Sequence, residues 1–311
     1  TELRPGRPHR RWREVDAAMV DAAGAVQAQY ARLGKTGKPQ AGEWTVLAGF
    51  VLSRGSGAAD EVVALGTGTK CLTRTQVARD SAGWLVHDAH AEVCARRSLL
   101  LYFLDQLELA ATRPLESIFV AAESGGYQLR PGMSLHMYSS QPPCGDAALF
   151  GALADGEPPM GSPGIDAPAG QKRQRLEVEA EVEAHRTGAR PASAGECAEE
   201  AAGGGLACKL GLVRTKPGRG ERTCCMSCSD KLARWVRLGL QGALLSLLLP
   251  APIGIASLSV GRPCCLGALR RALVSRTLPR TLPAPRSQAA AAAEGAEGAE
   301  GAEGAEGAEG A

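Results

Sequence analysis

The chain has 311 residues, and its 35 lysines and arginines against 33 aspartates and glutamates give a formal net charge of +2. This balance excludes a polycationic nucleic-acid binder, so any contact with RNA must come from local clusters of cations. Hydrophobic residues make up 44% of the chain, which is enough for a sizeable core, although aromatic residues make up only 4%.

Ten cysteines are spread unevenly along the chain, unlike the dense framework of a small disulfide-bonded secreted domain. No signal peptide or lipidation motif is visible. The longest apolar run, residues 242–252, is too short to span a bilayer. These features predict an intracellular protein, in the nucleus or the cytoplasm, with no membrane contact.

The pattern of apolar residues predicts alternating strands and helices. Strands are expected over residues 44–52, 61–65, 117–122, 134–138 and 253–260. Helices are expected over residues 12–33, from the segment after His90 to about residue 108, after Cys228, and over residues 266–276.

Three stretches lack such a pattern. Residues 1–11 are rich in arginine and proline and are expected to be loose, and residues 151–205 form a low-complexity insertion. The tail, residues 279–311, ends in a repeat of Ala-Glu-Gly that has nothing to bury. The remaining parts, residues 12–150 and 206–278, are expected to fold as one domain.

Residues 213–222 combine five basic side chains with three loop-breaking residues. Such a segment is usually a solvated loop, but its cations could also follow a phosphate backbone.

His90 and Glu92 form an H-x-E pair at the start of a predicted helix. In zinc nucleobase deaminases this histidine binds the metal, and the glutamate moves protons without being a ligand. Alone the pair is a weak signal, because three-residue matches arise by chance. Two later cysteine segments strengthen it.

A catalytic zinc site uses three protein ligands and leaves one position open for water. Cys144 follows Pro143 and supplies a first sulfur, but Ala147 stands where a P-C-x-x-C motif would place the second. Cys228, at a predicted helix start, is the best candidate for that sulfur. A separate structural half-site of Cys225 and Cys228 remains an alternative.

Four segments carry a resemblance to the deaminase domain shared by the RNA-editing and the tRNA-specific adenosine deaminases. They are Gly66–Cys71, Asp88–Glu92 with Arg96–Ser98, Pro143–Ala147, and Met226–Lys231 with Ala233–Trp235. Two further stretches, residues 30–45 and 214–223, look like the tRNA branch in particular.

The resemblance implies an α/β fold, a three-layer α/β/α sandwich of the cytidine-deaminase type with a mixed sheet. It implies a zinc ion on His90, Cys144 and Cys228, with Glu92 as the catalytic proton shuttle. It also implies hydrolysis of the adenosine amine to give inosine in tRNA, at the adenosine 3′ of the anticodon. Thr69 and Lys70 match positions that line the nucleotide pocket.

The family also binds inositol hexakisphosphate. The matching cations here are Arg96, Arg97, Lys231 and Arg234, and Asp88 would link them to the zinc site. The chain departs from its relatives at His87 and at Val236–Arg237, where asparagines are usual, and past the strand of residues 253–260. There it lacks the Lys- and Tyr-bearing region that completes the inositol phosphate site.

Two alternatives to a tRNA adenosine deaminase stay open. One is a deaminase of duplex RNA, and the other is a truncated, inactive RNA-binding remnant. The expected partner is tRNA, and no obligate protein partner is evident.

Overall fold

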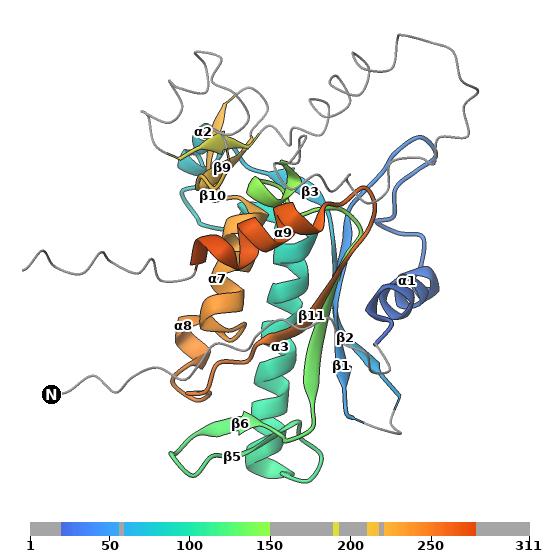
Figure 1. The fold of residues 1–311 in the computed structure, drawn as a ribbon, viewed down its shortest axis with the longest axis vertical. Helices are drawn as coiled ribbons and strands as arrows, with labels where there is room; N and C mark the ends of the chain where they lie inside the picture. The colour runs from blue at the N-terminus through green and yellow to red at the C-terminus, as the bar shows by residue number, and fades with distance from the viewer. Residues whose placement is uncertain (1–19, 56–58, 150–188, 193–209, 218–220, 278–311) are drawn as a thin grey trace, which may run out of the picture. The chain divides into compact units, whose positions relative to one another are not determined.

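The computed structural model describes residues 20–55, 59–149, 189–192, 210–217 and 221–277, which carry the elements labelled in Figure 1. The strands are β1 (Leu47–Ser53), β2 (Glu61–Thr67), β3 (Thr69–Cys71), β4 (Asp88–His90), β5 (Phe119–Ala121), β6 (Tyr127–Leu129), β7 (Ser134–Ser139), β8 (Arg190–Pro191), β9 (Arg214–Pro217), β10 (Arg222–Met226) and β11 (Ile255–Val260). The helices are α1 (Ala22–Arg32), α2 (Arg74–Ala78), α3 (Ala91–Thr112), α7 (Cys228–Leu238), α8 (Gly242–Leu245) and α9 (Leu266–Leu273), with short 3-10 turns η1 (Asp146–Ala148) and η2 (Ser275–Thr277).

A four-stranded sheet in the order β11-β7-β1-β2 forms the middle layer. Strand β1 runs antiparallel to both β2 and β7, whereas β11 runs parallel to β7, so the sheet is mixed. Helix α1 covers one face, and α3, α7 and α9 lie on the other side (Figure 1). The predicted α/β fold with a mixed sheet is confirmed.

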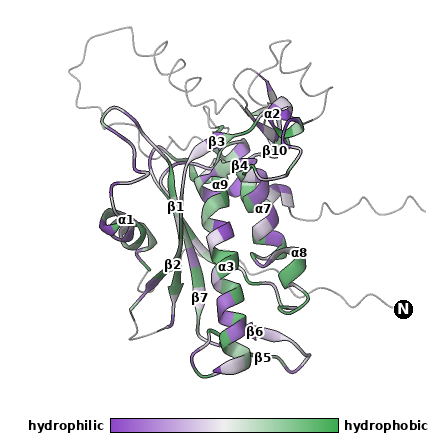
Figure 2. Cartoon of the chain, turned by 180° about the vertical axis from the view of Figure 1, so that it is seen from behind, coloured by the Kyte–Doolittle hydropathy of each residue, from purple (hydrophilic) through white to green (hydrophobic). Residues whose placement is uncertain are grey.

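Strand β1 is buried on both faces, which explains its unbroken apolar sequence. Successive side chains of a strand point to opposite faces. Phe50 and Leu52 pack in the main core with Phe103 of α3. Val51 points the other way and packs with Val26 of α1. Figure 2 shows the apolar colouring of β1 between the two helical layers.

The sequence predicts the four strands of the main sheet, β5 and the four longest helices near their observed positions. The strands expected at residues 44–52, 61–65, 117–122, 134–138 and 253–260 correspond to β1, β2, β5, β7 and β11. The expected first helix begins later, as α1 at Ala22, and residues 12–19 lie outside the described part of the chain.

Two local expectations need correction. Residues 213–222 were expected to form a loop, but they contribute to an antiparallel hairpin of β9 and β10, in which Arg214 and Lys216 are each only 1% exposed. The sequence also predicts a helix that begins at Cys144, after the turn at Pro143. In the structure only the 3-10 turn η1 follows, and it begins at Asp146. The loop was expected because the sequence does not distinguish a buried, paired lysine or arginine from one in solvent.

Most of the low-complexity stretches cannot be compared with expectation. Residues 1–11 and 279–311, and residues 151–205 except for 189–192, lie outside the described residues. Within that exception, Arg190–Pro191 forms β8 and pairs with β9, which the sequence does not predict. None of the helices in the described part of the chain has the length and apolar character that a membrane crossing requires.

Gly66 allows α3 to approach the sheet closely. A Cβ atom added at this position would lie 2.3 Å from the backbone nitrogen of Ala95 and 2.6 Å from the carbonyl oxygen of Ala91. Both neighbours are backbone atoms of the first turns of α3 and cannot rotate away. A glycine here therefore positions the beginning of α3, where His90 and Glu92 lie.

We expect Gly66→Ala to lower the free energy of unfolding by about 1–3 kcal/mol, because overpacking displaces the backbone of α3. Gly34→Ala is the matched control, since a Cβ there meets no atom within 4 Å. Its stability should change by less than about 1 kcal/mol. Urea denaturation measures both variants, and equal stability of the two would contradict the packing role of Gly66.

Candidate active site

Three segments that are far apart in the sequence bring one histidine and two cysteines together. The ligand atoms of His90, Cys144 and Cys228 all lie within 4.8 Å of one another. His90 Nδ1 is 3.8 Å from Cys144 Sγ and 3.6 Å from Cys228 Sγ. Tetrahedral zinc with bonds of about 2.0–2.3 Å needs donor atoms about 3.3–3.8 Å apart, so this set of donors fits zinc.

The local structure around these ligands favours anionic sulfur. His90 is the residue that precedes α3, and Cys228 is the first residue of α7. The backbone nitrogen of Cys228 donates a hydrogen bond of 3.3 Å to Cys144 Sγ, so the positive end of α7 faces that sulfur. Hydrogen bonds from Cys228 and His90 hold the pKa of the Cys144 thiol well below its usual value, despite burial.

Glu92 lies beside the three ligands in the first turn of α3. Its side chain is buried, with the residue 3% exposed, and its Oε2 atom lies 3.3 Å from Cys228 Sγ. Burial raises the pKa of this carboxyl group, and the neighbouring Cys144 raises it further. A carboxyl group with a raised pKa can both accept and return a proton near neutral pH.

Ser229, next to Cys228, forms hydrogen bonds that link this segment to the segment of Cys144. Its backbone nitrogen donates a hydrogen bond of 2.9 Å to the carbonyl oxygen of Cys144. Its hydroxyl donates to the carbonyl oxygen of Pro143 and accepts from the backbone nitrogen of Ala147, each at 3.0 Å. The sequence places Ser229 directly after a candidate ligand but gives no sign of these contacts.

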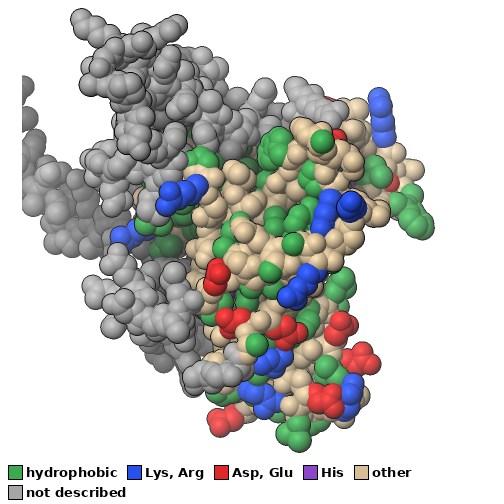
Figure 3. Space-filling model, turned by 90° about the vertical axis from the view of Figure 1, so that its right-hand side faces the viewer, with side chains coloured by type: hydrophobic (Ala, Val, Ile, Leu, Met, Phe, Trp, Pro, Cys, Tyr) green, Lys and Arg blue, Asp and Glu red, His purple; other side chains and the backbone are tan. Residues whose placement is uncertain are grey.

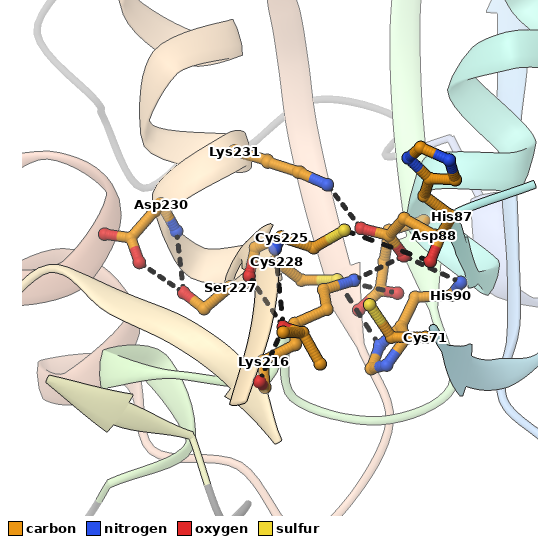
Figure 4. Close-up of polar contacts among 12 residues, drawn as sticks. Cys71, His87, Asp88, His90, Lys216, Cys225, Ser227, Cys228, Asp230 and Lys231 are labelled. Carbon is orange, nitrogen blue, oxygen red and sulfur yellow. Dashed lines mark hydrogen bonds and ion pairs between the residues drawn. The ribbon is translucent and has the colours of Figure 1, made fainter. Parts of the chain in front are cut away.

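One buried carboxylate, Asp88, joins two lysines next to the metal ligands (Figure 4). Lys216 Nζ lies 2.8 Å from Asp88 Oδ1, and Lys231 forms an ion pair with the other oxygen. Burial raises the pKa of Asp88, but the attraction and hydrogen bonds of Lys216 and Lys231 outweigh it and lower the pKa to about 2. Burial lowers the pKa of Lys216, but Cys228, Cys144 and Asp88 outweigh this effect and raise it.

The sequence identifies Asp88 and Lys231 as linking residues but misses Lys216. The reason is its position in the basic segment 213–222, where it is one of several similar cations. In β9, Arg214 and Lys216 are buried and Thr215 is half-buried, but all three residues are polar, so the sequence shows no apolar alternation that would predict a strand.

The four cations expected to bind inositol hexakisphosphate come from two helices. Arg96 and Arg97 lie on α3, and Lys231 and Arg234 lie on α7. Burial lowers the pKa of Arg96, and the nearby Arg234 and Arg97 lower it further, so these cations repel one another. Among the described residues no carboxylate forms an ion pair with an arginine of this cluster.

The guanidinium of Arg96 is held by two neutral partners. Its Nε donates a hydrogen bond of 3.0 Å to the carbonyl oxygen of Leu240, and it lies 5.2 Å from the ring centroid of Trp235. Arg97 and Arg234 are exposed within the described structure, whereas Arg96 and Lys231 are half-buried. The cluster is therefore open on one side.

Thr69 and Lys70, the expected pocket residues, lie on the short strand β3. Thr69 stands opposite His90 in the antiparallel pairing of β3 with β4. Both side chains are exposed. The structure thus brings this pair next to the candidate metal ligands.

The chain is similar to the adenosine-deaminase (editase) domain family over residues 64–291. It is 35% identical over 331 aligned residues to tRNA-specific adenosine deaminase 1 of Mus musculus, which covers 79% of this chain and 65% of the relative. The enzyme of the same name from Drosophila melanogaster is 37% identical over 264 residues, covering 84% of this chain and 59% of the relative.

The double-stranded RNA-specific editase Adar of Drosophila melanogaster is 32% identical over 221 residues, covering 70% of this chain but 29% of the relative. The chain thus spans about 59–65% of the length of the two tRNA-specific relatives. The family match covers most of the chain and includes every candidate ligand, and the chain therefore belongs to the adenosine-deaminase (editase) family.

Proposed function

We propose that the chain catalyses the zinc-dependent hydrolytic deamination of adenosine to inosine in tRNA. It would thus be a hydrolase of C–N bonds in cyclic amidines. The observation that carries this proposal is the close approach of His90, Cys144, Cys228 and Glu92. Two sulfurs and one imidazole leave a fourth zinc position open, and the adjacent carboxyl group is not needed as a ligand.

Zinc held by these three residues would lower the pKa of a water molecule and so supply a nucleophile for C6 of adenine. Glu92 accepts the proton of the attacking water, because its pKa is raised by burial. It then delivers protons to N1 of the base and to the departing amine. Adenosine and water thus give inosine and ammonia, and Glu92 returns to its starting state.

The relatives support tRNA over duplex RNA as the substrate class. The tRNA-specific enzymes are 35% and 37% identical and match 79% and 84% of this chain. The duplex-RNA editase is 32% identical and matches 70%. We place the target at the adenosine 3′ of the anticodon, as the resemblance to the tRNA-specific branch implies. This base lies in a loop, so it costs less to unstack than a paired one. The enzyme would act inside the cell, in the nucleus or the cytoplasm.

The mixed distribution of charge is consistent with local contacts to RNA. Figure 3 shows acidic and basic side chains interspersed among the described residues on one face of the molecule. Cations beside the candidate site, such as Lys70 on β3, would then contact phosphates close to the target base.

The second part of the proposal is a polyphosphate ligand, inositol hexakisphosphate, on Arg96, Arg97, Lys231 and Arg234. The support is the convergence of four cations from two helices with Asp88 as their one carboxylate partner among the described residues. A polyanion would relieve their mutual repulsion. Through Lys231 and Asp88 the ligand would also stabilise Lys216, which faces both candidate sulfurs.

We expect Glu92→Gln to lower the deamination rate of a tRNA substrate by at least about 100-fold, because the amide cannot carry protons. The zinc content should stay at the wild-type level. Glu108→Gln, at an exposed position of the same helix, is the control and should retain full activity. Inosine formation and metal content are measured on the same samples, and equal rates for the two variants would refute the role of Glu92.

We expect Asp88→Asn to lower the free energy of unfolding at pH 7 by roughly 2 kcal/mol. The ion pairs lower the pKa of Asp88 to about 2, and each unit of pKa shift corresponds to about 1.36 kcal/mol. The ionised carboxylate stabilises the fold above the unfolded pKa, near 4, and this contribution disappears as the pH falls towards 2. The difference between wild type and variant should therefore shrink over that range. Denaturation of both metal-free proteins tests this, and a constant difference would argue against the ion pairs.

We expect inositol hexakisphosphate to raise the melting temperature of the chain by several degrees. Arg234→Ala should weaken this effect, whereas Arg237→Ala, an exposed cation on the same helix, should not. Thermal denaturation with and without the ligand provides the measurement. Equal shifts in both variants would mean that the ligand binds elsewhere.

A further inference from the structure

Two cysteines that are not candidate metal ligands lie side by side next to the active site (Figure 4). Cys71 ends β3, and Cys225 lies in β10. The carbonyl oxygen of His87 accepts a hydrogen bond of 2.9 Å from the backbone nitrogen of Leu72, and Cys225 Sγ lies 3.9 Å from the same oxygen. This shared contact places Cys225 beside the end of β3, where the Cys71 and Cys225 thiols interact with each other.

The pair is accessible in a way that the candidate ligand Cys228 is not. Cys71 and Cys225 are each partly exposed, whereas Cys228 is fully buried. A small reagent can therefore reach Cys71 and Cys225 without opening the core. Bound zinc would further protect Cys144 and Cys228, because their sulfurs would be engaged as ligands.

The surroundings of Cys225 favour its thiolate. The hydrogen bond from Cys71 lowers the pKa of Cys225 to about 6, with Lys231 and Lys216 adding to the effect against burial and Asp88. The same hydrogen bond is the first cause that raises the pKa of Cys71. One thiol of the pair is thus prepared to attack, and the other remains protonated next to it.

We propose that Cys71 and Cys225 form a reversible redox pair, which small disulfides such as oxidised glutathione convert into an intramolecular disulfide. The Cys225 thiolate attacks one sulfur of the reagent, and one glutathione thiolate leaves. This glutathione takes the proton of Cys71, whose sulfur attacks Cys225 and expels the second glutathione as a thiolate. That thiolate takes from solvent the proton that Cys225 released when it ionised. The protein loses two electrons and two protons, and the reagent becomes two molecules of glutathione.

The hydrogen bond that raises the pKa of Cys71 ends at the first step. Once Cys225 is capped by glutathione it no longer carries a negative charge, so Cys71 loses the interaction that held its proton. The second attack becomes easier after the first.

A disulfide between Cys71 and Cys225 would join β3 and β10 covalently on two sides of the candidate site. Strand β3 carries Thr69 and Lys70, and β10 leads directly into Ser227 and Cys228. The position of Thr69 and Lys70 relative to Cys228 would then be restrained. This effect on activity rests on the proposed function, whereas formation of the disulfide does not.

The test uses the zinc-loaded full chain, incubated with oxidised glutathione and then alkylated. Trypsin should yield residues 71–74 joined to residues 223–231, which mass spectrometry identifies. Cys71→Ser and Cys225→Ser should abolish this product. Cys224→Ser, at the exposed neighbouring position of the same strand, should retain it. The zinc content of the oxidised protein should be unchanged.

Several results would overturn the proposal. They are a linked peptide that persists in Cys225→Ser, a first disulfide between Cys144 and Cys228 with loss of zinc, or no intramolecular disulfide at all. Deamination is assayed in parallel. We expect the oxidised wild type to lose at least about 10-fold in rate and to recover with dithiothreitol, while Cys225→Ser resists oxidation. A disulfide in a chain without deaminase activity would refute the proposed function but not the redox pair.

Discussion

The candidate active site depends on burying one carboxylate between two lysines. Asp88 lies on β4, two residues before His90, while Lys216 comes from β9 and Lys231 from α7, three residues after Cys228. A buried charge without partners is strongly destabilising, so each of these residues requires the others. The same contacts therefore fix the distance between the histidine and cysteine segments of the candidate metal site.

The mixed sheet explains why this network can form at one end of α3. Strand β2 packs closely on α3 through Gly66, and the chain continues from β2 into β3, whose pairing with β4 places Thr69 opposite His90. Helix α7 then lies on the same side of the sheet as α3 (Figure 1). Packing on that face thus brings the helix N-termini, with their favourable dipoles, towards a common point.

The sequence reveals the parts of this site whose chemistry is local. His90 and Glu92 are recognisable because their spacing and the following helix are enough to suggest a role. Zinc-ligand chemistry makes Cys144 and Cys228 candidates, and the resemblance to the family supports the whole set. Lys216 and Ser229 are missed, because their partners lie in segments more than 80 residues away. A lysine of a basic stretch and a serine of a helix start have no distinctive pattern of their own. Their roles follow only from tertiary contacts.

The cysteines show most clearly how position decides chemistry. Cys225 and Cys228 are three residues apart and suggest a metal half-site, but only Cys228 belongs to the group of candidate ligands found among the described residues. Cys228 is buried at the start of α7, whereas Cys225 remains on β10 and faces Cys71. Burial next to an imidazole favours metal binding, and partial exposure next to a second thiol favours redox exchange. The change from strand to helix between residues 226 and 228 therefore separates two different sulfur chemistries, although Lys216 interacts with both cysteines.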